Sequence, residues 1–597
     1  METFVKNQIF RVDIICVLTA FLCFDVLHAT GVTCDRHSYI HFIFSFYSPV
    51  CDVTSELSLK KTFHEWRFSE APLLFKLPVE VNEENHIREV QNVIFSKSYP
   101  TPLKTEIKLA ATSRDALRNV LDMDEEIVQT EHFLLIASGN GILRGYPPLT
   151  HRYGGYQFGT WAGQLGDGRA HLLGEYLNRF GERWELQLKG SGLTPYSRDG
   201  DGRAVIRSSV REFLSSETMH FLGIPTSRAA SLVISNDPVW RDQFYDGHFK
   251  QERAAVLMRL AKSWFRFGSF EILAHYGETS LLGELADFII EHHFPHIPPD
   301  DPYKYASFFQ EVVEQTARLI AMWQSVGFVH GVCNTDNFSI LSMTIDYGPF
   351  RFMDAYDPKM VPNTSDDENR YSYENQPEAG YFNLNKLKLA IIRLLPAHQQ
   401  FVLKQILSGY QDLYTGYVVH LFCRKLGLPD VKESDGELID SLLAIMKDTK
   451  SDFTMTFRHL SEWNLDLSSP EVSNSRLWTL SHLKSHEPFR DWLELYRKRL
   501  ASSHVQESQR KSVMHWTNPR YVLRNWILEE IIQQVEKNDF SLLQQALGIF
   551  KKPFTDQIEA EHCQRIGTRS SRHPAEMTEY SRNNMWCAGP GLWFVYV

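Results

Sequence analysis

The feature that most constrains the fold is a pair of oxygen-donor side chains near the middle of the chain. Asn337 ends the segment HGVCNTDN at residues 330–337, and Asp346 begins the segment DYG soon after it. Amide and carboxylate oxygens are ligands that Mg²⁺ takes from proteins, usually one or two of them together with phosphates and waters. Short β-type runs at residues 338–341 and 343–345 lie between the two ligands. We therefore expect a metal site in a loop bordered by strands.

The same segment has the layout of a kinase catalytic centre without its catalytic aspartate. Protein kinases carry H-R-D-x-x-x-x-N and then D-F-G, in which the Asn and the second Asp hold Mg²⁺. Aligning His330 with the kinase histidine places Val332 at the position of the base. Asp336 is then the only candidate base in the motif, and His330 is expected to support the loop by hydrogen bonding. The motif predicts a Mg-nucleotide site whose chemistry need not be that of a kinase.

The length and the net charge of the chain limit its organisation and the classes of ligand it can bind. At 597 residues the chain is longer than one hydrophobic core usually serves, so we expect two or more lobes. The net charge of −11 argues against non-specific nucleic-acid binding, and any anionic ligand must be held by local basic groups. The 8 cysteines include no C-x-x-C pair and no cluster with histidine, which argues against a zinc site.

The N-terminus resembles a secretory signal peptide. Basic residues precede an apolar run at residues 14–24, and a small-x-small site ends at residue 31. Asp13 and Asp25 argue against a clean targeting segment, and a leader without a targeting role is the alternative. We expect residues 1–31 to be a targeting segment without a stable membrane span, because its apolar core is too short.

The rest of the chain divides by composition. Residues 32–64 form a variable leader, and β-type runs at 133–137, 170–175 and 184–188 precede a helix with apolar spacing from 205 to 214. From about residue 305 the pattern is mainly helical. The class is therefore α+β, in the order of a protein-kinase-like bilobal fold. The expected parts are a β-rich nucleotide-binding lobe at 65–270, a helical lobe with the metal motif at 271–555, and a tail at 556–597.

Two groups in the first lobe are candidates for holding phosphates. Gly166 and Gly168, followed by Arg169, lie in a glycine-rich stretch whose backbone N–H groups could approach a phosphate, although Asp167-Gly168 is also a favoured hairpin turn. Lys189 ends a predicted strand and Glu212 lies on the next helix, as in the kinase device for holding nucleotide phosphates. The alternative for this pair is two solvated side chains.

Three other charged positions are weaker candidates. Asp201-Gly202 is expected to open the helix that follows, where the Asp could simply complement the helix dipole. Arg259 and Arg266 are seven residues apart, so they would share one face if the segment were helical and could grip a polyphosphate. A basic surface stripe is the alternative for these two.

Five stretches, in this order along the chain, are distinctive: LRGYPPLTHRYGGYQFGTWAGQLGDGRAHLLGE, WELQLKGSGLTPYSRDGDGRAVIRSSVREFL, RFGSFE, GFVHGVCNTDNFSILSMTIDYGPFRFMDAYDP and NPRYVLRNW. They resemble the selenoprotein O family of protein adenylyltransferases, also called the YdiU family, and the resemblance covers about residues 65–555. It implies a kinase-like fold that binds ATP in a flipped orientation. It also implies nucleotide contacts at Gly166, Gly168, Arg169, Lys189, Asp201, Gly202, Arg259, Arg266 and Asp346, with Glu212 as the partner of Lys189. Asp336 falls on the base, and Asn337 and Asp346 fall on the ligands of Mg²⁺, with Mn²⁺ as the alternative metal.

The resemblance implies transfer of AMP from ATP to Ser, Thr or Tyr hydroxyls of proteins. In that reaction pyrophosphate leaves, so positive charge is needed around the terminal phosphates, and positioning carries much of the catalysis. Two rivals remain: a kinase that transfers the γ-phosphoryl group, and an inactive ATP-binding pseudokinase scaffold. The resemblance also implies a mitochondrial location, against the secretory reading of the N-terminus. It fades near Gln557, and Cys587 in the unfamiliar tail is a candidate reactive thiol.

Overall fold

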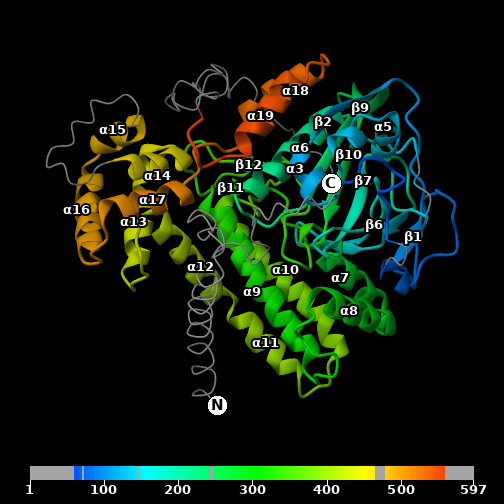
Figure 1. The fold of residues 1–597 in the computed structure, drawn as a ribbon. Helices are drawn as coiled ribbons and strands as arrows, with labels where there is room; N and C mark the ends of the chain where they lie inside the picture. The colour runs from blue at the N-terminus through cyan, green and yellow to red at the C-terminus, as the bar shows by residue number, and fades with distance from the viewer. Residues whose placement is uncertain are drawn as a thin grey trace, which may run out of the picture. The chain divides into compact units, whose positions relative to one another are not determined.

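The computed structural model describes residues 59–69, 73–141, 143, 145, 147–242, 247–463 and 477–557. The predicted targeting segment, most of the leader, and Cys587 with nearly all of the tail lie outside these residues. Within them, strands dominate up to residue 261 and helices dominate afterwards (Figure 1). The prediction of an α+β chain with a β-rich first part and a helical second part is confirmed.

An antiparallel sheet forms the centre of the first part. Its order is β1-β3-β6-β7-β10-β9-β2, with β8 paired to β10. The strands are β1 (Phe95–Lys97), β2 (Ile107–Thr112), β3 (Leu149–His151), β6 (Ala170–Leu177), β7 (Arg183–Lys189), β8 (Ala204–Val205), β9 (Arg228–Arg241) and β10 (Lys250–Ala261). Two smaller two-stranded sheets pair β4 (Gly154–Gln157) with β5 (Thr160–Gln164) and β11 (Phe328–Val329) with β12 (Arg351–Phe352).

Strand β10 has apolar cores on both faces. Ala254, Val256 and Met258 belong to one buried cluster, whereas Ala255 and Leu257 belong to another, because successive side chains of a strand point to opposite faces. Helix α5 (Glu131–Ser138) contributes to the first cluster and α6 (Ile206–Phe221) to the second, and both contact β9 and β10. The sheet is thus covered on both sides, and α6 is fixed against its centre.

Two sequence-based element assignments are wrong. The run at 133–137 is part of helix α5, where the Thr130 side chain caps the N-terminus and Gly139 ends the helix in the left-handed region at φ 77°. Short apolar runs do not distinguish strand from helix, and here the two caps favour the helix. The runs at 338–341 and 343–345 form only isolated bridges, such as the one between Phe338 and Thr344.

The remaining helices of the described ranges are 4 to 22 residues long. They are α3 (Arg114–Asn119), α4 (Glu125–Val128), α7 (Phe267–Tyr276), α8 (Thr279–His293), α9 (Lys304–Ser325), α10 (Gln376–Ile391), α11 (Gln400–Ser408), α12 (Tyr410–Lys425), α13 (Asp435–Thr449), α14 (Phe453–Glu462), α15 (Trp478–Lys484), α16 (Glu487–Ala501), α17 (Glu507–Thr517), α18 (Asn525–Val535) and α19 (Ser541–Phe550). The 3₁₀ helices among the described residues are η1 (Leu73–Lys76), η2 (Thr335–Asn337), η3 (Tyr373–Asn375) and η4 (Ile392–Leu394). Across the described ranges, none of these helices has the length and apolar character needed to cross a bilayer.

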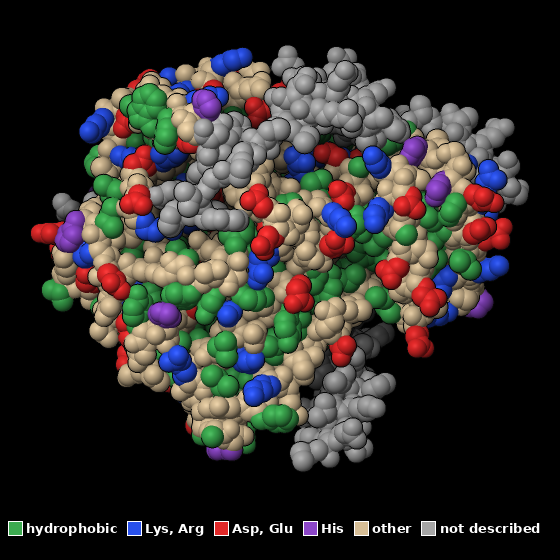
Figure 2. All heavy atoms as spheres, turned by 180° about the vertical axis from the view of Figure 1, so that it is seen from behind, with side chains coloured by type: hydrophobic (Ala, Val, Ile, Leu, Met, Phe, Trp, Pro, Cys, Tyr) green, Lys and Arg blue, Asp and Glu red, His purple; other side chains and the backbone are tan. Residues whose placement is uncertain are grey.

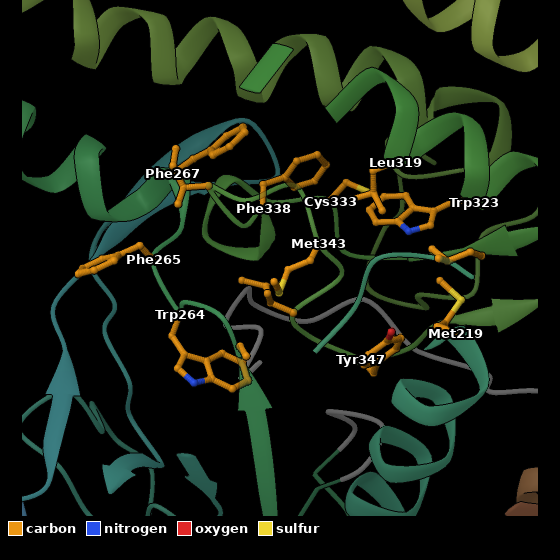
Figure 3. Packing of buried hydrophobic residues seen from close by; sticks show 14 of the residues in the cluster. Met219, Trp264, Phe265, Phe267, Leu319, Trp323, Cys333, Phe338, Met343 and Tyr347 are labelled. Carbon is orange, nitrogen blue, oxygen red and sulfur yellow. The ribbon is translucent and has the colours of Figure 1, made fainter. Parts of the chain in front are cut away.

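The sheet and the helices share a core beneath the metal motif. One buried cluster contains residues from Leu74 to Phe550, on both sides of the predicted lobe boundary at residue 270. In Figure 3, the rings of Phe267, Phe338 and Trp323 pack in this cluster, close to the loop that follows β11. Helices α18 and α19 pack against α6, so the end of the described chain returns to the first part (Figure 1).

Candidate active site

A buried network of four charged side chains joins the sheet, helix α6 and the metal motif. Lys189, the last residue of β7, places its Nζ 2.7 Å from Asp346 Oδ1 and 2.8 Å from Glu212 Oε2. Arg259 on β10 donates from a guanidinium nitrogen to Glu212 Oε1 at 2.8 Å. Each of the four side chains is less than a tenth exposed. The structure therefore brings together the Lys–Glu pair and one of the two predicted metal ligands.

The network keeps Asp346 ionised. Burial alone would raise the pKa of the Asp346 carboxyl, but Lys189, Arg259 and Arg169 together hold that pKa below its usual value. The Tyr347 N–H also donates to Asp346 Oδ1 at 2.9 Å. An ionised carboxylate in a cationic pocket is a suitable ligand for a divalent metal that arrives with phosphate groups.

Arg169 extends the cationic side of this network. Burial lowers the pKa of its guanidinium, while Asp346 and Glu212 favour the charged form, and its Nε has no hydrogen-bond partner. The glycines before it are required by packing: a Cβ on Gly166, at φ 74°, would lie 2.3 Å from Cγ of Tyr196. The alternative of a hairpin turn at 167–168 is wrong, because β5 pairs with β4 and not with β6.

Arg259 and Arg266 do not share a helix face. Arg259 lies in β10, where it also donates to Gln187, and Arg266 is the N-cap residue of α7. The part of the segment that contains Arg259 is a strand, because alternate residues of β10 enter two different cores. The seven-residue spacing of the two arginines does not reveal this two-residue period. Arg266 nevertheless reaches the metal loop, donating to the carbonyl oxygen of Asp336 at 3.0 Å, and its guanidinium lies 4.2 Å from the Tyr153 ring centroid.

Asp336 and Asn337 lie in η2 with unsatisfied oxygens. Asp336 Oδ2 accepts from Gln157 Nε2 at 3.3 Å, whereas its Oδ1 is buried without a hydrogen-bond partner. Asn337 Nδ2 donates to the Val332 carbonyl at 3.0 Å, and Asn337 Oδ1 is likewise buried and unpartnered. Buried polar atoms usually have a hydrogen-bond partner, so these two oxygens are available to a ligand.

The pKa of the Asp336 carboxyl is suitable for a general base. Burial raises the pKa of its carboxyl to about 6, against the opposing effects of Arg266 and the Gln157 hydrogen bond. His330 behaves as expected for a supporting residue: burial lowers its pKa to about 4, and its Nδ1 accepts from the Val332 N–H at 3.4 Å. Val332 itself is a buried apolar side chain, so the position of the kinase base carries no proton acceptor.

The donor set at Asn337 and Asp346 fits a hard divalent cation. One is an unpartnered amide oxygen and the other an ionised carboxylate. Among the described residues no group of three His, Cys, Asp or Glu side chains could hold a metal unaided. A two-ligand site of this kind depends on substrate phosphates for the rest of its coordination.

The β4–β5 hairpin covers this loop, and sequence reasoning missed how. The Tyr156 N–H donates to Thr335 Oγ1 at 2.7 Å, and a Cβ on Gly155 would lie 3.0 Å from Asp336 Oδ1. Thr335 Oγ1 in turn donates to Glu271 Oε2 on α7 at 2.6 Å. Burial raises the pKa of Glu271 to about 8. The glycine-rich stretch was read as a phosphate-binding segment, and no spacing pattern pointed to Glu271 or Gln157.

Asp201 and Gly202 have packing and ion-pair roles of their own. Asp201 forms a bidentate pair with Arg241 at 2.7 and 2.8 Å and precedes β8, so it does not open α6 as expected. Gly202, at φ 71°, is required because a Cβ there would lie 2.1 Å from the Gly192 carbonyl carbon. Their predicted contact with a nucleotide stays a prediction.

Comparison with known proteins agrees with this geometry. The family described as "Protein adenylyltransferase SelO" matches residues 79–550. A relative named protein nucleotidyltransferase YdiU from Xanthomonas axonopodis pv. citri is 42% identical over 484 residues, which is 81% of this chain and 92% of the relative. Proteins of the same name from Azoarcus sp. (41% identical; 83% of this chain, 96% of the relative) and Methylobacillus flagellatus (39%; 84% and 97%) are similar over comparable lengths.

Proposed function

Because the chain belongs to the SelO family of protein adenylyltransferases, we propose that it transfers AMP from ATP to Ser, Thr or Tyr hydroxyls of other proteins. The observation that carries this proposal is the network of Lys189, Glu212, Asp346 and Arg259 beside the unpartnered oxygens of Asp336 and Asn337. It combines cations for phosphates, donors for a metal and a candidate base in one buried site.

The proposed reaction forms a bond between the acceptor oxygen and the α-phosphorus of ATP. The bond from that phosphorus to the bridging oxygen breaks, pyrophosphate leaves, and the hydroxyl proton passes to Asp336. Lys189, Arg169, Arg259 and Arg266 would stabilise charge on the phosphates, because fixed cations in a buried site need little reorganisation. A base with a pKa of about 6 is mostly ionised at neutral pH and can accept the proton.

We infer that Asn337 and Asp346 would hold Mg²⁺, with Mn²⁺ as the alternative. The unpartnered Asn337 Oδ1 and the low pKa of Asp346 support this assignment. When bound, the ion would neutralise charge on the ATP phosphates. We also propose a kinase-like arrangement of the two lobes, supported by the strand lysine Lys189, which contacts both the helix glutamate and the D-Y-G aspartate.

Labelled ATP separates this proposal from its rivals. ATP labelled on the α-phosphate should label an acceptor protein, and ATP labelled on the γ-phosphate should not. Asp336→Asn should reduce labelling about 10²–10⁴-fold, the usual contribution of a general base, and Asp346→Ala should abolish it. Asp300→Asn, an exposed change in a loop, is the matched control.

Two results would overturn the proposal. Incorporation of the γ-label alone would identify a kinase. Equal background labelling by the natural protein and Asp346→Ala, at saturating Mg-ATP, would identify an inactive nucleotide-binding scaffold. We further propose a mitochondrial location, with the secretory pathway as the alternative, which mass spectrometry of the mature N-terminus and fractionation would test.

A further inference from the structure

A cluster of aromatic and cationic side chains borders the loop that carries Asp336. It is formed by the β4–β5 hairpin, the segment before η3, and helix α10, which packs against α7 (Figure 1). All five side chains are half-buried, so each one keeps a solvent-facing part. We call this cluster the hairpin platform; its members are Tyr156, Trp161, Arg370, Phe382 and Lys386.

The platform is held together by ring and cation contacts. Lys386 Nζ lies 3.9 Å from the Tyr156 ring centroid and 5.0 Å from that of Phe382, and the Arg370 guanidinium lies 4.6 Å from the Phe382 ring. The Tyr156 ring meets Trp161 edge-on at 5.3 Å. Cations over ring faces keep their charge and remain able to bind an anion from the other side.

The two cations of the platform lack carboxylate partners. Within the described part of the chain, neither Lys386 nor Arg370 has a carboxylate oxygen within the 4.0 Å of a salt bridge. Three acidic residues, Asp366, Asp367 and Glu368, shortly precede Arg370. Asp366 uses both carboxylate oxygens to accept from the backbone N–H groups of Arg370 and Tyr371.

Some other cations with restricted exposure do have a carboxylate partner. Arg152 is paired with Glu278, and Arg228 with Glu217. Acidic residues outnumber basic ones in this chain, 73 to 62. Basic and acidic side chains are interspersed over the face in Figure 2. Two neighbouring cations that remain unpaired in such a chain are suited to a carboxylate from outside.

The platform is connected directly to the catalytic loop. The Tyr156 N–H donates to Thr335 Oγ1 at 2.7 Å, the next residue, Gln157, donates to Asp336 at 3.3 Å, and the Phe158 N–H donates to Asn334 Oδ1 at 3.1 Å. A hydroxyl placed at Asp336 is therefore followed by chain that passes the platform. Groups over the platform therefore belong to residues close in sequence to that hydroxyl.

We infer that the hairpin platform docks an acidic segment of the acceptor protein, with Asp or Glu side chains close in sequence to the modified hydroxyl. Lys386 and Arg370 receive the carboxylates, and the rings of Tyr156 and Phe382 pack against the peptide backbone. This inference rests on the proposed AMP transfer for its orientation. Charge complementarity favours this occupant, and a neutral or basic segment is an outcome that the test can reveal.

Binding of short peptides tests the platform separately from catalysis. The probes are a fluorescein-labelled serine peptide flanked by Asp and Glu, and the same peptide with Asn and Gln, each added to the full chain with Mg²⁺ and a non-hydrolysable ATP analogue. Fluorescence anisotropy should show about tenfold tighter binding of the acidic peptide. Lys386→Gln combined with Arg370→Gln should remove this preference. Lys388→Gln, on the same helix, should preserve it.

A charge reversal guards against a loss caused by unfolding. Lys386→Glu should shift the preference towards a serine peptide flanked by Lys and Arg, which a misfolded protein would not do. Equal binding of the acidic and neutral peptides to the natural protein overturns the inference, as does an unchanged preference in the double variant. Labelling of an acceptor protein from α-labelled ATP tests the proposed function alone. If labelling is absent but the preference for the acidic peptide remains, AMP transfer is overturned and the docking surface is not.

Discussion

Replacing Glu212 by glutamine removes the carboxylate that links Lys189 to Arg259. Both cations lie 2.8 Å from Glu212, and all three side chains are less than a tenth exposed. At an effective dielectric of about 20, one such pair is worth roughly 4 kcal/mol before desolvation is counted. Lys189 keeps Asp346 at 2.7 Å, and glutamine can still accept a hydrogen bond. We therefore expect a net loss of about 3 kcal/mol, the lower end of the cost of breaking a buried pair.

Urea denaturation measures this loss. With a slope of about 3 kcal/mol per M, the midpoint of Glu212→Gln should fall by about 1 M. Glu284→Gln, on the exposed face of α8, is the control and should change stability by no more than about 0.5 kcal/mol. The kcat/KM for ATP, measured as labelling of an acceptor protein, should fall about tenfold, because Lys189 is then positioned only by Asp346.

A double-mutant cycle makes the test specific. If Lys189 and Glu212 act as a pair, the combined change Lys189→Gln with Glu212→Gln should cost less than the sum of the two single changes. An unchanged urea midpoint together with unchanged labelling in Glu212→Gln would refute the argument that the buried network organises the site. Strict additivity in the cycle would refute the coupling itself.

Two further predictions concern the contacts of α7. Burial raises the pKa of Glu271 to about 8 in the folded protein, from an ordinary value of 4.5, so the folded state holds a proton that the unfolded chain releases. The free energy of unfolding should therefore fall as pH rises from about 5 to 8, by up to about 1.4 kcal/mol per pH unit. Urea denaturation at several pH values should show a smaller fall for Glu271→Gln. Equal pH dependence of the natural protein and this variant would contradict the prediction. A Cβ on Gly268 would lie 2.1 Å from the Gly154 carbonyl oxygen, so Gly268→Ala should displace the hairpin, cost about 1–3 kcal/mol and reduce labelling. Gly283→Ala, where the nearest atom is 3.7 Å away, should instead be neutral or stabilising, and equal behaviour of the two alanine variants would show that the hairpin contact is unimportant.

The charge network was the most predictable part of the site. The chemistry requires a lysine at a strand end, a glutamate in the following helix and an aspartate in D-Y-G. These residue types occur in a fixed order along the chain, so they can be recognised in the sequence. The structure places Lys189 against both Glu212 and Asp346. The long helix α9 was equally readable, because its apolar stripe extends over many turns and Gly327 follows its end at φ 68°.

The least predictable features were a strand that is buried on both faces and a side chain whose role depends on a contact between distant segments. The spacing of Arg259 and Arg266 suits a helix, but β10 is buried on both faces and therefore lacks the alternation that marks most strands. Glu271 could not be found from sequence patterns, because its position depends on α7 packing beneath η2. A single acidic residue in an apolar stretch carries no spacing signal, and only the folded contact with Thr335 gives it meaning.

The packing of α18 and α19 on α6 has a consequence for synthesis. The ribosome produces α6 more than three hundred residues before these two helices, so the nascent first lobe emerges with one apolar flank of the Glu212 helix uncovered. Arg253 of β10 finds its partners, the Glu536 carbonyl at 3.0 Å and Asn538 Oδ1 at 2.9 Å, only when translation reaches them. Full burial of α6 is thereby delayed until residues 525–550 have been made, and chains released before then would expose this flank to chaperones and proteases.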